Sequence, residues 1–364
     1  MIITIQKIIS SGDGIGWGDG KTFFVPRVIP GETVEVCTVA PLRRALFVTD
    51  FRIVEASPLR QEPCCPLFGR CGGCSFLHIP YPLHRQIKQG ILEEFFRQQG
   101  EHVSVPVTTI EVGTFRLRSR AKVHITAGRA AFSRRATHEL VPFDDCPLLH
   151  EGLNAVIRED TPTRDDGTLH YEYASRSGQW SPRDPVVEKV VAGELFRVSR
   201  GSFFQASEEG AAALVALLEE IIRTVRPSVV LDLFCGVGLF SRFAARAGCD
   251  VIGIDLNAGD DFAVNVPGGR FLQRDLTRSL SLPSADLIVA DPPRVGMVPP
   301  LIEAIARHSA SHLCYVSCDG ATFVRDVVRL ARRGRFLLRS MTLVDQFPFT
   351  ARIEVVAHLV RRET

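Results

Sequence analysis

The sequence predicts a doubly wound α/β domain, preceded by a small all-β barrel and a mixed segment. Beyond residue 200, strand-like apolar runs alternate with helical runs, which is typical of a parallel sheet covered on both faces. Near the N-terminus, short apolar runs separated by turn residues favour an OB-like barrel of five strands. We therefore expect three domains, at 1–57, 58–200 and 201–364.

The individual elements follow from the same patterns. The barrel strands are expected within 2–9, 22–28, 33–39 and 46–54, with a glycine-rich turn over 12–20. The middle segment should hold a helix over 82–99, strands over 116–126 and 131–134, and an irregular connection over 159–185. In the last domain, Ser207 should cap a helix over 208–225, and the stretch 260–267 is expected to be too short for a full helix.

Composition narrows the class of protein. Of 364 residues, 45% are apolar and 23% charged, as in soluble globular proteins, and the net charge is only +2. One local block departs from this balance, because seven Lys or Arg and no Asp or Glu lie between Phe115 and Arg135. Such a block is either a solvated face or a phosphate-binding strand pair. Alternation would place four of its cations on one strand face: Arg116, Arg118, Arg120 and Lys122.

The sequence also predicts the cellular compartment of the protein. No secretory signal is evident at the N-terminus, and no stretch is long and apolar enough to span a membrane. We expect a cytoplasmic monomer without a membrane partner. Ten cysteines in a reducing compartment then indicate a metal site and chemistry rather than a disulfide framework.

A cofactor loop is predicted at 230–238, where a buried strand runs into a glycine turn and a helix. Gly236 and Gly238 would let a ligand approach the backbone, and Asp255, ending the next strand, can accept hydrogen bonds from ribose hydroxyls. A dinucleotide site is the rival, but its third glycine is replaced by Ser241, so the pyrophosphate fingerprint is incomplete. A purely structural turn is the remaining alternative.

Four cysteines predict a metal centre. Cys65, Cys71 and Cys74 lie within ten residues, and Cys146 follows two aspartates. Four thiolates can bind an iron–sulfur cluster or zinc. Zinc sites more often contain two Cys-x-x-Cys pairs and only one is present here, so a [4Fe–4S] cluster is favoured. The spacing selects Cys65 rather than the adjacent Cys64.

Together these motifs resemble the RNA uracil-5-methyltransferases, specifically the branch acting on 23S ribosomal RNA. The resemblance covers nearly the whole chain, since the N-terminal barrel is similar to a TRAM domain and the cysteine spacing to the family's iron–sulfur motif. It implies S-adenosylmethionine and a [4Fe–4S] cluster as cofactors. RNA is the implied partner, with 23S rRNA favoured over tRNA, and the barrel and the basic strand would hold it.

The resemblance also assigns roles to single residues. It places the nucleophile on Cys318, the base on Glu354, and cofactor contacts on Gln205, Phe234, Asp255, Asp275 and Asp291. The family pattern Pro-His-Thr-x-His-x-Glu reads Pro-Phe-Thr-Ala-Arg-Ile-Glu over 348–354, so both histidines are replaced. The connection over 256–274 and the middle domain are also shorter than usual.

The chemistry of uracil explains why a thiol is needed. Carbon 5 becomes nucleophilic enough to take a methyl group only after a thiolate adds at carbon 6. Cys318 ends an apolar strand, where doubly wound folds present catalytic groups. A buried structural cysteine is the alternative, which suits Cys314 better, and Cys235 is a weaker candidate nucleophile. Glu354 would then remove the proton from carbon 5.

Three other functions stay open, and the first is that of an amino-methyltransferase. Asp291 begins an Asp-Pro-Pro-Arg run and would accept a hydrogen bond from the base or the cofactor. Amino-methyltransferases carry similar runs, but they need no thiol nucleophile. The other two are methylation of a tRNA uridine by the same chemistry, and an RNA-binding iron–sulfur protein with a degenerate methyltransferase fold.

Overall fold

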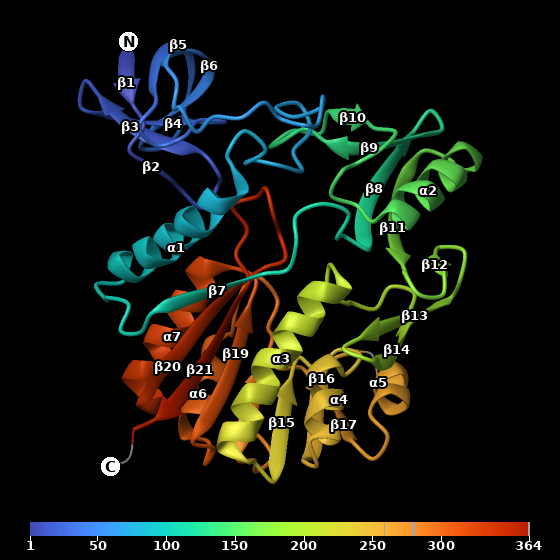
Figure 1. The fold of residues 1–364 in the computed structure, drawn as a ribbon. Helices are drawn as coiled ribbons and strands as arrows, with labels where there is room; N and C mark the ends of the chain where they lie inside the picture. The colour runs from blue at the N-terminus through green and yellow to red at the C-terminus, as the bar shows by residue number, and fades with distance from the viewer. Residues whose placement is uncertain (258, 279–280, 363–364) are drawn as a thin grey trace.

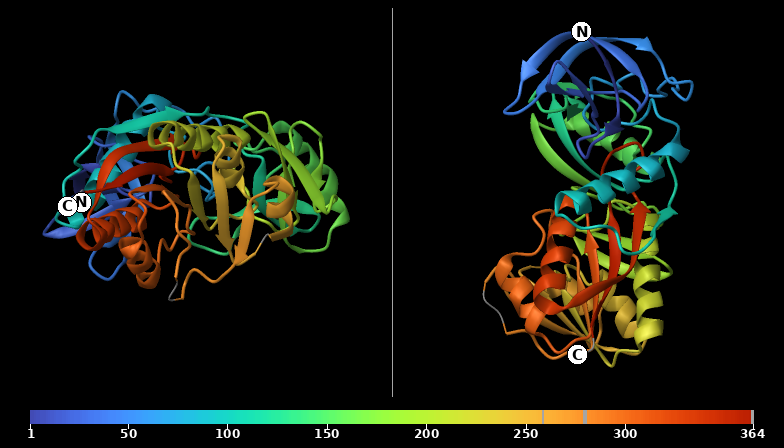
Figure 2. Two further views of the ribbon diagram at one scale, coloured as in Figure 1. Left: turned by 90° about the horizontal axis from the view of Figure 1, so that it is seen from below. Right: turned by 90° about the vertical axis from the view of Figure 1, so that its left-hand side faces the viewer.

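The structure is a computed structural model that describes residues 1–257, 259–278 and 281–362. The chain extends from an N-terminal barrel at one end to an α/β domain at the other, with a middle segment packed at the side (Figure 1). Figure 2 shows helix α1 (Tyr81–Gln98) between the barrel and the α/β domain. Among the described residues, none of the helices combines the length and apolar character that crossing a membrane requires.

The N-terminal sheet has six strands in the order β1-β5-β6-β4-β3-β2. Its strands are β1 (Ile2–Thr4), β2 (Lys7–Ile8), β3 (Gly14–Gly18), β4 (Lys21–Val25), β5 (Thr33–Pro41) and β6 (Leu46–Glu55). The prediction of five strands was wrong, because the run 2–9 is divided into two strands and the expected turn over 12–20 contains β3. A Cβ atom at Gly14 would collide with Val28 and Ile5, so this glycine serves close packing within a strand.

The middle segment forms a five-stranded sheet in the order β10-β9-β8-β11-β12 and a separate hairpin of β13 and β14. Helix α2 packs on the sheet, and a short 3-10 turn follows it. The bounds are β8 (Arg120–Thr126), β9 (Arg129–Ser133), β10 (Leu140–Pro142), α2 (Glu151–Asp160), η1 (Thr161–Thr163), β11 (Gly167–Tyr173), β12 (Trp180–Ser181), β13 (Val186–Val191) and β14 (Glu194–Ser199).

Two predictions for the middle segment were wrong. The strand expected from residue 116 begins only at Arg120, because Arg116 has a φ of 59° and turns the chain out of the extended conformation. The connection expected to be irregular over 159–185 contains β11 and β12. Pairing of β11 with β8 along six residues makes a strand of a segment whose own sequence favours turns.

The α/β domain confirms the predicted doubly wound fold. Its eight strands lie in the order β17-β16-β15-β18-β19-β21-β20-β7. The strands are β7 (Val107–Glu111), β15 (Val229–Leu233), β16 (Asp250–Asp255), β17 (Arg270–Gln273), β18 (Leu287–Ala290), β19 (His312–Ser317), β20 (Phe336–Asp345) and β21 (Val355–Arg361). The helices are α3 (Glu208–Val225), α4 (Leu239–Arg246), α5 (Gly259–Asn265), α6 (Pro299–Arg307) and α7 (Gly320–Gly334).

Alternate side chains of each strand enter two separate cores, one on each face of the sheet. Helices α1, α6 and α7 cover one face, and α3, α4 and α5 cover the other. As predicted, Ser207 caps α3, its hydroxyl accepting from Gly210 N at 2.9 Å. The order differs from the dinucleotide-binding order 3-2-1-4-5-6, because the antiparallel strand β21 lies between β19 and β20.

Tertiary contacts add two elements that the sequence did not indicate. Strand β7, from the middle of the chain, pairs in parallel with β20 and extends the large sheet beyond the segment 201–364. The short helix α5 forms where no full helix was expected. Its Asp261 accepts from Ser199 N at 2.9 Å and its Asn265 from Arg197 N at 2.8 Å, so hairpin β13–β14 holds it in place.

Substitution of Gly238 tests the packing below the cofactor loop. Its φ is 93°, and an added Cβ would lie 2.6 Å from Val266 Cγ2. We expect Gly238→Ala to lose roughly 1 kcal/mol from backbone strain and about 1–3 kcal/mol more from overpacking. Gly248→Ala is the matched control, because Gly248 has a φ of 89° and no atom within 4 Å of its added Cβ. Equal losses of unfolding free energy in urea would contradict the packing argument.

Candidate active site

The predicted catalytic and cofactor residues converge on one edge of the large sheet. Parallel strands β15, β16, β18 and β19 all end there, and antiparallel β21 begins there. A cavity of about 1010 Å³ opens at this edge. Residues widely separated in sequence line it: Gln205, Phe234, Gly236, Asp255, Asp291, Cys318 and Glu354.

Strand pairing brings Cys318 and Glu354 together. Ser317, the last residue of β19, is paired with Val355, the first of β21, so the next residue on one strand and the preceding residue on the other are neighbours. Burial, and then the charges of Glu354 and Asp291, raise the pKa of Cys318 to about 11. Burial and the charge of Asp291 likewise raise the pKa of Glu354 well above its ordinary value.

The two cysteines considered as alternatives to Cys318 lack this access. Cys314 is fully buried inside β19, and Cys235 is 5% exposed in the cofactor turn. Burial is the main cause that raises the pKa of both thiols far above the ordinary value for cysteine. Both residues pack in the core, as the structural alternative describes, and neither lines the cavity that contains Cys318.

A hydrogen-bond chain links the acidic groups through Gln346, which the sequence analysis missed. The Gln346 side-chain amide donates to Glu354 Oε2 at 2.9 Å and to Gln205 Oε1 at 3.2 Å. Gln205 in turn donates to Asp291 Oδ2 at 3.3 Å. Gln346 is fully buried and directly follows β20, so a polar residue after a buried strand was the signal that could have revealed it.

The buried ion pair of Lys88 and Asp345 was also missed. Lys88, on α1, donates to Asp345 Oδ1 at 2.5 Å and to the carbonyl oxygen of Phe347 at 2.9 Å. Both charged side chains are 4% exposed. The pair therefore fixes the start of the 346–354 loop, which carries Gln346 and leads to Glu354.

The cofactor loop has the predicted shape. Gly236 N donates to Asp255 Oδ2 at 3.0 Å, and Phe234 adopts a φ of 61°. A Cβ at Gly236 would meet no atom within 4 Å, so that the backbone faces open space in the cavity. Ser241, where a dinucleotide site would need glycine, donates to buried Asp232 at 2.6 Å.

Gly238 and Asp275 do not line the cavity. Gly238 begins α4 and packs against Val266 and Phe262. The Asp275 carboxylate accepts hydrogen bonds from Thr277 and Arg278, close to it in sequence. In this structure they therefore support the fold around the cavity, and a cofactor contact remains a prediction.

The four predicted metal ligands form the opposite wall of the same cavity. Cys65, Cys71, Cys74 and Cys146 all line it, whereas Cys64 is exposed and does not. Burial raises the pKa of Cys74 to about 12 and also raises the pKa of Cys71 and Cys146. In the described parts of the chain, no three His, Cys, Asp or Glu side chains are close enough together to hold a single metal ion.

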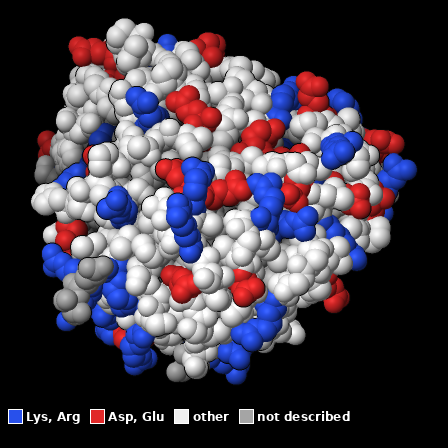
Figure 3. Space-filling view, turned by 60° about the horizontal axis from the view of Figure 1, so that its bottom comes forward, with Lys and Arg blue, Asp and Glu red and all other residues white. Residues whose placement is uncertain are grey.

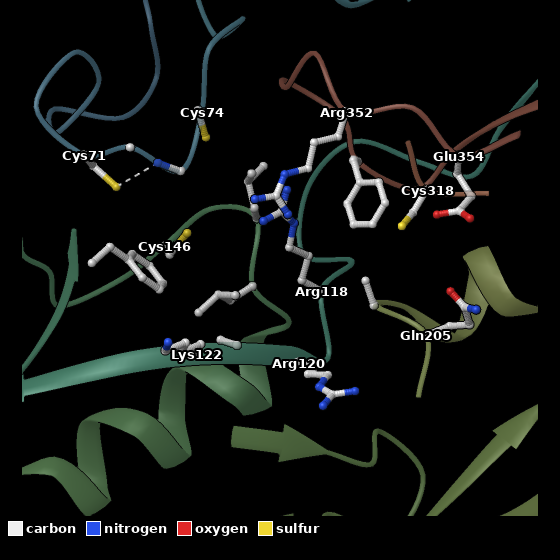
Figure 4. Close-up of a pocket in the computed structure, with 18 of the residues that line it drawn as sticks. Cys71, Cys74, Arg118, Arg120, Lys122, Cys146, Gln205, Cys318, Arg352 and Glu354 are labelled. Carbon is white, nitrogen blue, oxygen red and sulfur yellow. Dashed lines mark hydrogen bonds between the residues drawn. The ribbon is translucent and has the colours of Figure 1, made fainter. Parts of the chain in front are cut away.

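The predicted basic strand face is wrong in part. Only Arg120 and Lys122 lie on β8 and line the cavity, while Arg116 precedes the strand and pairs with Asp145 at 2.9 Å. Arg118 also precedes the strand. It reaches into the cavity, where its Nε and Nη2 atoms are buried and without a hydrogen-bond partner among the described residues. Figure 4 shows it between the thiols on one side and Cys318 on the other.

Surface charge gives little further guidance. On the face of the molecule in Figure 3, Lys and Arg are interspersed with Asp and Glu, in keeping with the net charge of +2. The cations that matter for the candidate site are those lining the cavity.

Comparisons with known proteins find similarity to RNA uracil-5-methyltransferases. A family model described as tRNA (Uracil-5-)-methyltransferase matches residues 250–362. The 23S rRNA (uracil(1939)-C(5))-methyltransferase RlmD of Pseudomonas fluorescens is 29% identical, over 98% of this chain and 93% of its own. The tRNA (uracil(54)-C(5))-methyltransferase of Pyrococcus horikoshii is 26% identical, over 98% and 100%. Over nearly its whole length the chain is thus similar to RNA uracil-5-methyltransferases.

A solved structure of this family shares the fold from end to end. The tRNA (uracil-54, C5)-methyltransferase of Pyrococcus abyssi, in complex with S-adenosyl-L-homocysteine, superposes with a TM-score of 0.79. The match covers 99% of both chains at 23% identity, so it includes the barrel and the middle sheet. The similarity of fold therefore extends over the whole chain.

The raised pKa of Glu354 predicts a pH-dependent effect on stability. The folded protein keeps the proton on this buried carboxyl at a pH where the unfolded chain has lost it, so the carboxyl destabilises the fold increasingly as pH rises from 5 to 9. Glu354→Gln cannot titrate. We expect its melting temperature to exceed that of the parent at pH 9 and to differ much less at pH 5, as measured by circular dichroism.

Glu93→Gln is the control for this experiment. Glu93 is an exposed glutamate on α1 that forms no hydrogen bond or ion pair with any described residue. Its substitution should shift the melting temperature equally at both pH values. A Glu354→Gln difference that does not grow with pH would mean that the folded protein holds this carboxyl ionised.

Proposed function

We propose that this protein transfers a methyl group from S-adenosylmethionine to carbon 5 of a uridine in RNA, with Cys318 as a covalent nucleophile and Glu354 as the base. The observation that carries the proposal is the pairing of β19 with β21. It sets a thiol beside a buried carboxyl in a cavity that also contains the cofactor loop.

Cys318 would add through its sulfur to carbon 6 of the uracil, which leaves an enolate that is nucleophilic at carbon 5. Because the pKa of Cys318 is raised, the free protein holds the thiol protonated, and the thiol proton must pass to solvent when the uracil binds. Arg294 lowers the pKa of this thiol and so favours the thiolate. An amino-methyltransferase would need neither a thiol nucleophile nor its deprotonation.

Glu354 must first lose its own proton; its carboxylate would then remove the proton from carbon 5 after methyl transfer, and the carbon 6–sulfur bond would break to release Cys318. A carboxyl with a raised pKa is a stronger base than an exposed one, and hydrogen bonding by Gln346 holds it in position. The hydrogen bonds from Gln346 to Gln205 and from Gln205 to Asp291 would orient Gln205 and Asp291 toward the uracil or the cofactor.

S-adenosylmethionine supplies the methyl group when it is bound. The residues that would hold it are those of the cofactor loop, with Gly236 allowing close approach of the backbone and Asp255 accepting from the ribose hydroxyls. Phe234 and Asp291 line the same side of the cavity. Asp275 would contribute only after a rearrangement of its local hydrogen bonds.

The RNA would reach Cys318 with its target base turned out of the stack. Arg120, Lys122 and the 63%-exposed ring of Phe203 line the cavity and offer charge and a stacking surface. The N-terminal barrel, proposed as a TRAM domain, would bind the RNA further away. We favour 23S rRNA over tRNA, and the bacterial relative from P. fluorescens named above supports this choice.

We further propose that Cys65, Cys71, Cys74 and Cys146 hold a [4Fe–4S] cluster. Each thiolate binds a different iron in such a cluster, so the four sulfurs surround it instead of converging on one ion as zinc requires. The buried donors of Arg118 support this reading. A guanidinium without a partner is costly to bury, and an anionic cluster beside it would accept its hydrogen bonds.

The cluster proposal predicts the metal content. Protein purified without oxygen should be brown and contain about four iron and four sulfide per chain. Cys71→Ser should lower both, whereas Cys64→Ser should not, because Cys64 does not line the cavity. Stoichiometric zinc without acid-labile sulfide would refute the cluster.

The catalytic proposal predicts a trapped adduct. In Glu354→Gln, thiolate addition and methyl transfer should proceed while release fails, so that a denaturing gel shows RNA joined to protein and carrying labelled methyl. The Cys318→Ala, Glu354→Gln double variant should bind RNA and form no adduct. Cys314→Ala, which removes the buried thiol of the same strand, should leave turnover in place.

The same assay separates the alternatives. Methyl transfer to a 23S rRNA transcript but not to a tRNA transcript would support the rRNA assignment, and the reverse would support tRNA. Binding of RNA with no transfer to either transcript would indicate a degenerate methyltransferase fold. Normal turnover by Glu354→Gln, without an adduct, would place the base elsewhere.

A further inference from the structure

A second cavity lies on the other side of Cys318. It measures about 360 Å³ and shares Cys318, Arg294 and Arg352 with the larger cavity. Residues 72–74 of the cysteine loop line both cavities, and the remaining walls of the second come from Ser10 and Ser11 of the barrel, Ser75, Phe95, Arg135, the start of α7, and residues 350, 351 and 353. The residues of the cofactor loop line only the larger cavity.

Three arginines approach one another where the two cavities meet. The guanidinium carbons of Arg118 and Arg352 lie 5.8 and 5.9 Å from the centre of the same Phe347 ring. Figure 4 shows both side chains reaching into the space between the thiols and Cys318. Shielding from solvent, and then repulsion by Arg294 and Arg118, lower the pKa of Arg352 to about 10.

Arg118 faces the thiols of the proposed iron–sulfur cluster, whereas the other two arginines have no directly bonded acid in the part of the chain that the structure describes. Neither Arg294 nor Arg352 forms a side-chain hydrogen bond or ion pair with any residue that the structure describes. The acidic side chain of the second cavity, Asp319, accepts instead from Thr322 N at 2.9 Å and caps α7. Cations held together without an anion favour binding of one from outside.

We propose that Arg294 and Arg352 bind a phosphate of the RNA backbone next to the target uridine, in the second cavity. This inference rests on the proposed function, because it takes Cys318 as the atom that the base must reach. With the methyl donor on the side of the cofactor loop, the ribose and phosphate of the nucleotide must lie on the other side of Cys318. The second cavity is there, and the hydroxyls of Ser10 and Ser75, which bond to no other described residue, can donate to phosphate oxygens.

Arg352 stands in this chain where the family pattern has a histidine. An arginine keeps its charge throughout the physiological pH range and can bind two phosphate oxygens at once, which a histidine cannot. The site is therefore a positioning device for the nucleotide, in addition to the effect of Arg294 on the pKa of the Cys318 thiol.

The test measures binding without a methyl donor, so it does not depend on turnover. The probe is a single-stranded oligoribonucleotide with one uridine, and affinity is measured against salt concentration. Arg294→Gln with Arg352→Gln should weaken binding roughly tenfold and reduce the salt slope by about 0.7 or more. Arg294→Lys with Arg352→Lys should restore most of the slope. Arg307→Gln, an exposed arginine at the end of α6, is the control.

A second set of probes identifies the contact. A neutral methylphosphonate replaces, in turn, each phosphate flanking the uridine. One replacement should weaken binding to the parent roughly tenfold and have little further effect on the double Gln variant. Additive effects at every position, or an unchanged salt slope, would overturn the proposal. Lower kcat at saturating RNA with unchanged affinity would also overturn it, because the arginines would then act on the thiol.

The two proposals fail in distinguishable ways. If the parent methylates RNA but no single methylphosphonate loses its effect in the double Gln variant, the phosphate site is wrong and the catalytic proposal stands. If one methylphosphonate does lose its effect in that variant but no methyl is transferred, the phosphate site stands and the catalytic proposal is wrong. Melting temperatures of all variants show whether the fold is intact.

Discussion

The antiparallel pairing of β21 between β19 and β20 is the constraint on which the candidate site depends. In a sheet of parallel strands alone, residues preceding a strand and residues following one lie at opposite edges. Because β21 runs the other way, Glu354 precedes its strand at the same edge where Cys318 follows β19. The thiol and the carboxyl thus meet through backbone hydrogen bonds, and their relative position does not depend on a flexible loop.

Charge at this edge is unbalanced in the protein alone. A thiol and two carboxyls are shielded from solvent, so burial raises the pKa of each and favours its neutral form. In the same cavity, Arg294 and Arg118 repel the charge of Arg352 and lower its pKa. Both features are costly to stability. They suit a site whose charges are completed only when cofactors and RNA are present, as the proposed function requires.

The loop from Gln346 to Glu354 joins the two sides of the cavity. Lys88 holds its beginning, and β21 holds its end. Between these points it carries Phe347, whose ring lies near two arginines, and Phe349, whose carbonyl oxygen accepts from the backbone N–H groups of Ser75 and Phe76 after the cysteine loop. A change around the four thiols can therefore reach the residues beside Cys318 through direct contacts.

The sequence by itself determined the elements whose signals are local. The alternation beyond residue 200, the Ser207 cap, the glycine turn and the spacing of the cysteines each depend on residues close in the chain. Only the tertiary structure decided the rest. β7 and α5 form through partners far away in sequence, and Arg118 left the expected strand face because Arg116 turns the chain. Gln346 and Lys88 matter because of partners far along the chain: Gln346 donates to Gln205, 141 residues away, and Lys88 to Asp345, 257 residues away. Periodicity reports which face of an element is buried, but it carries no information about which distant element covers that face.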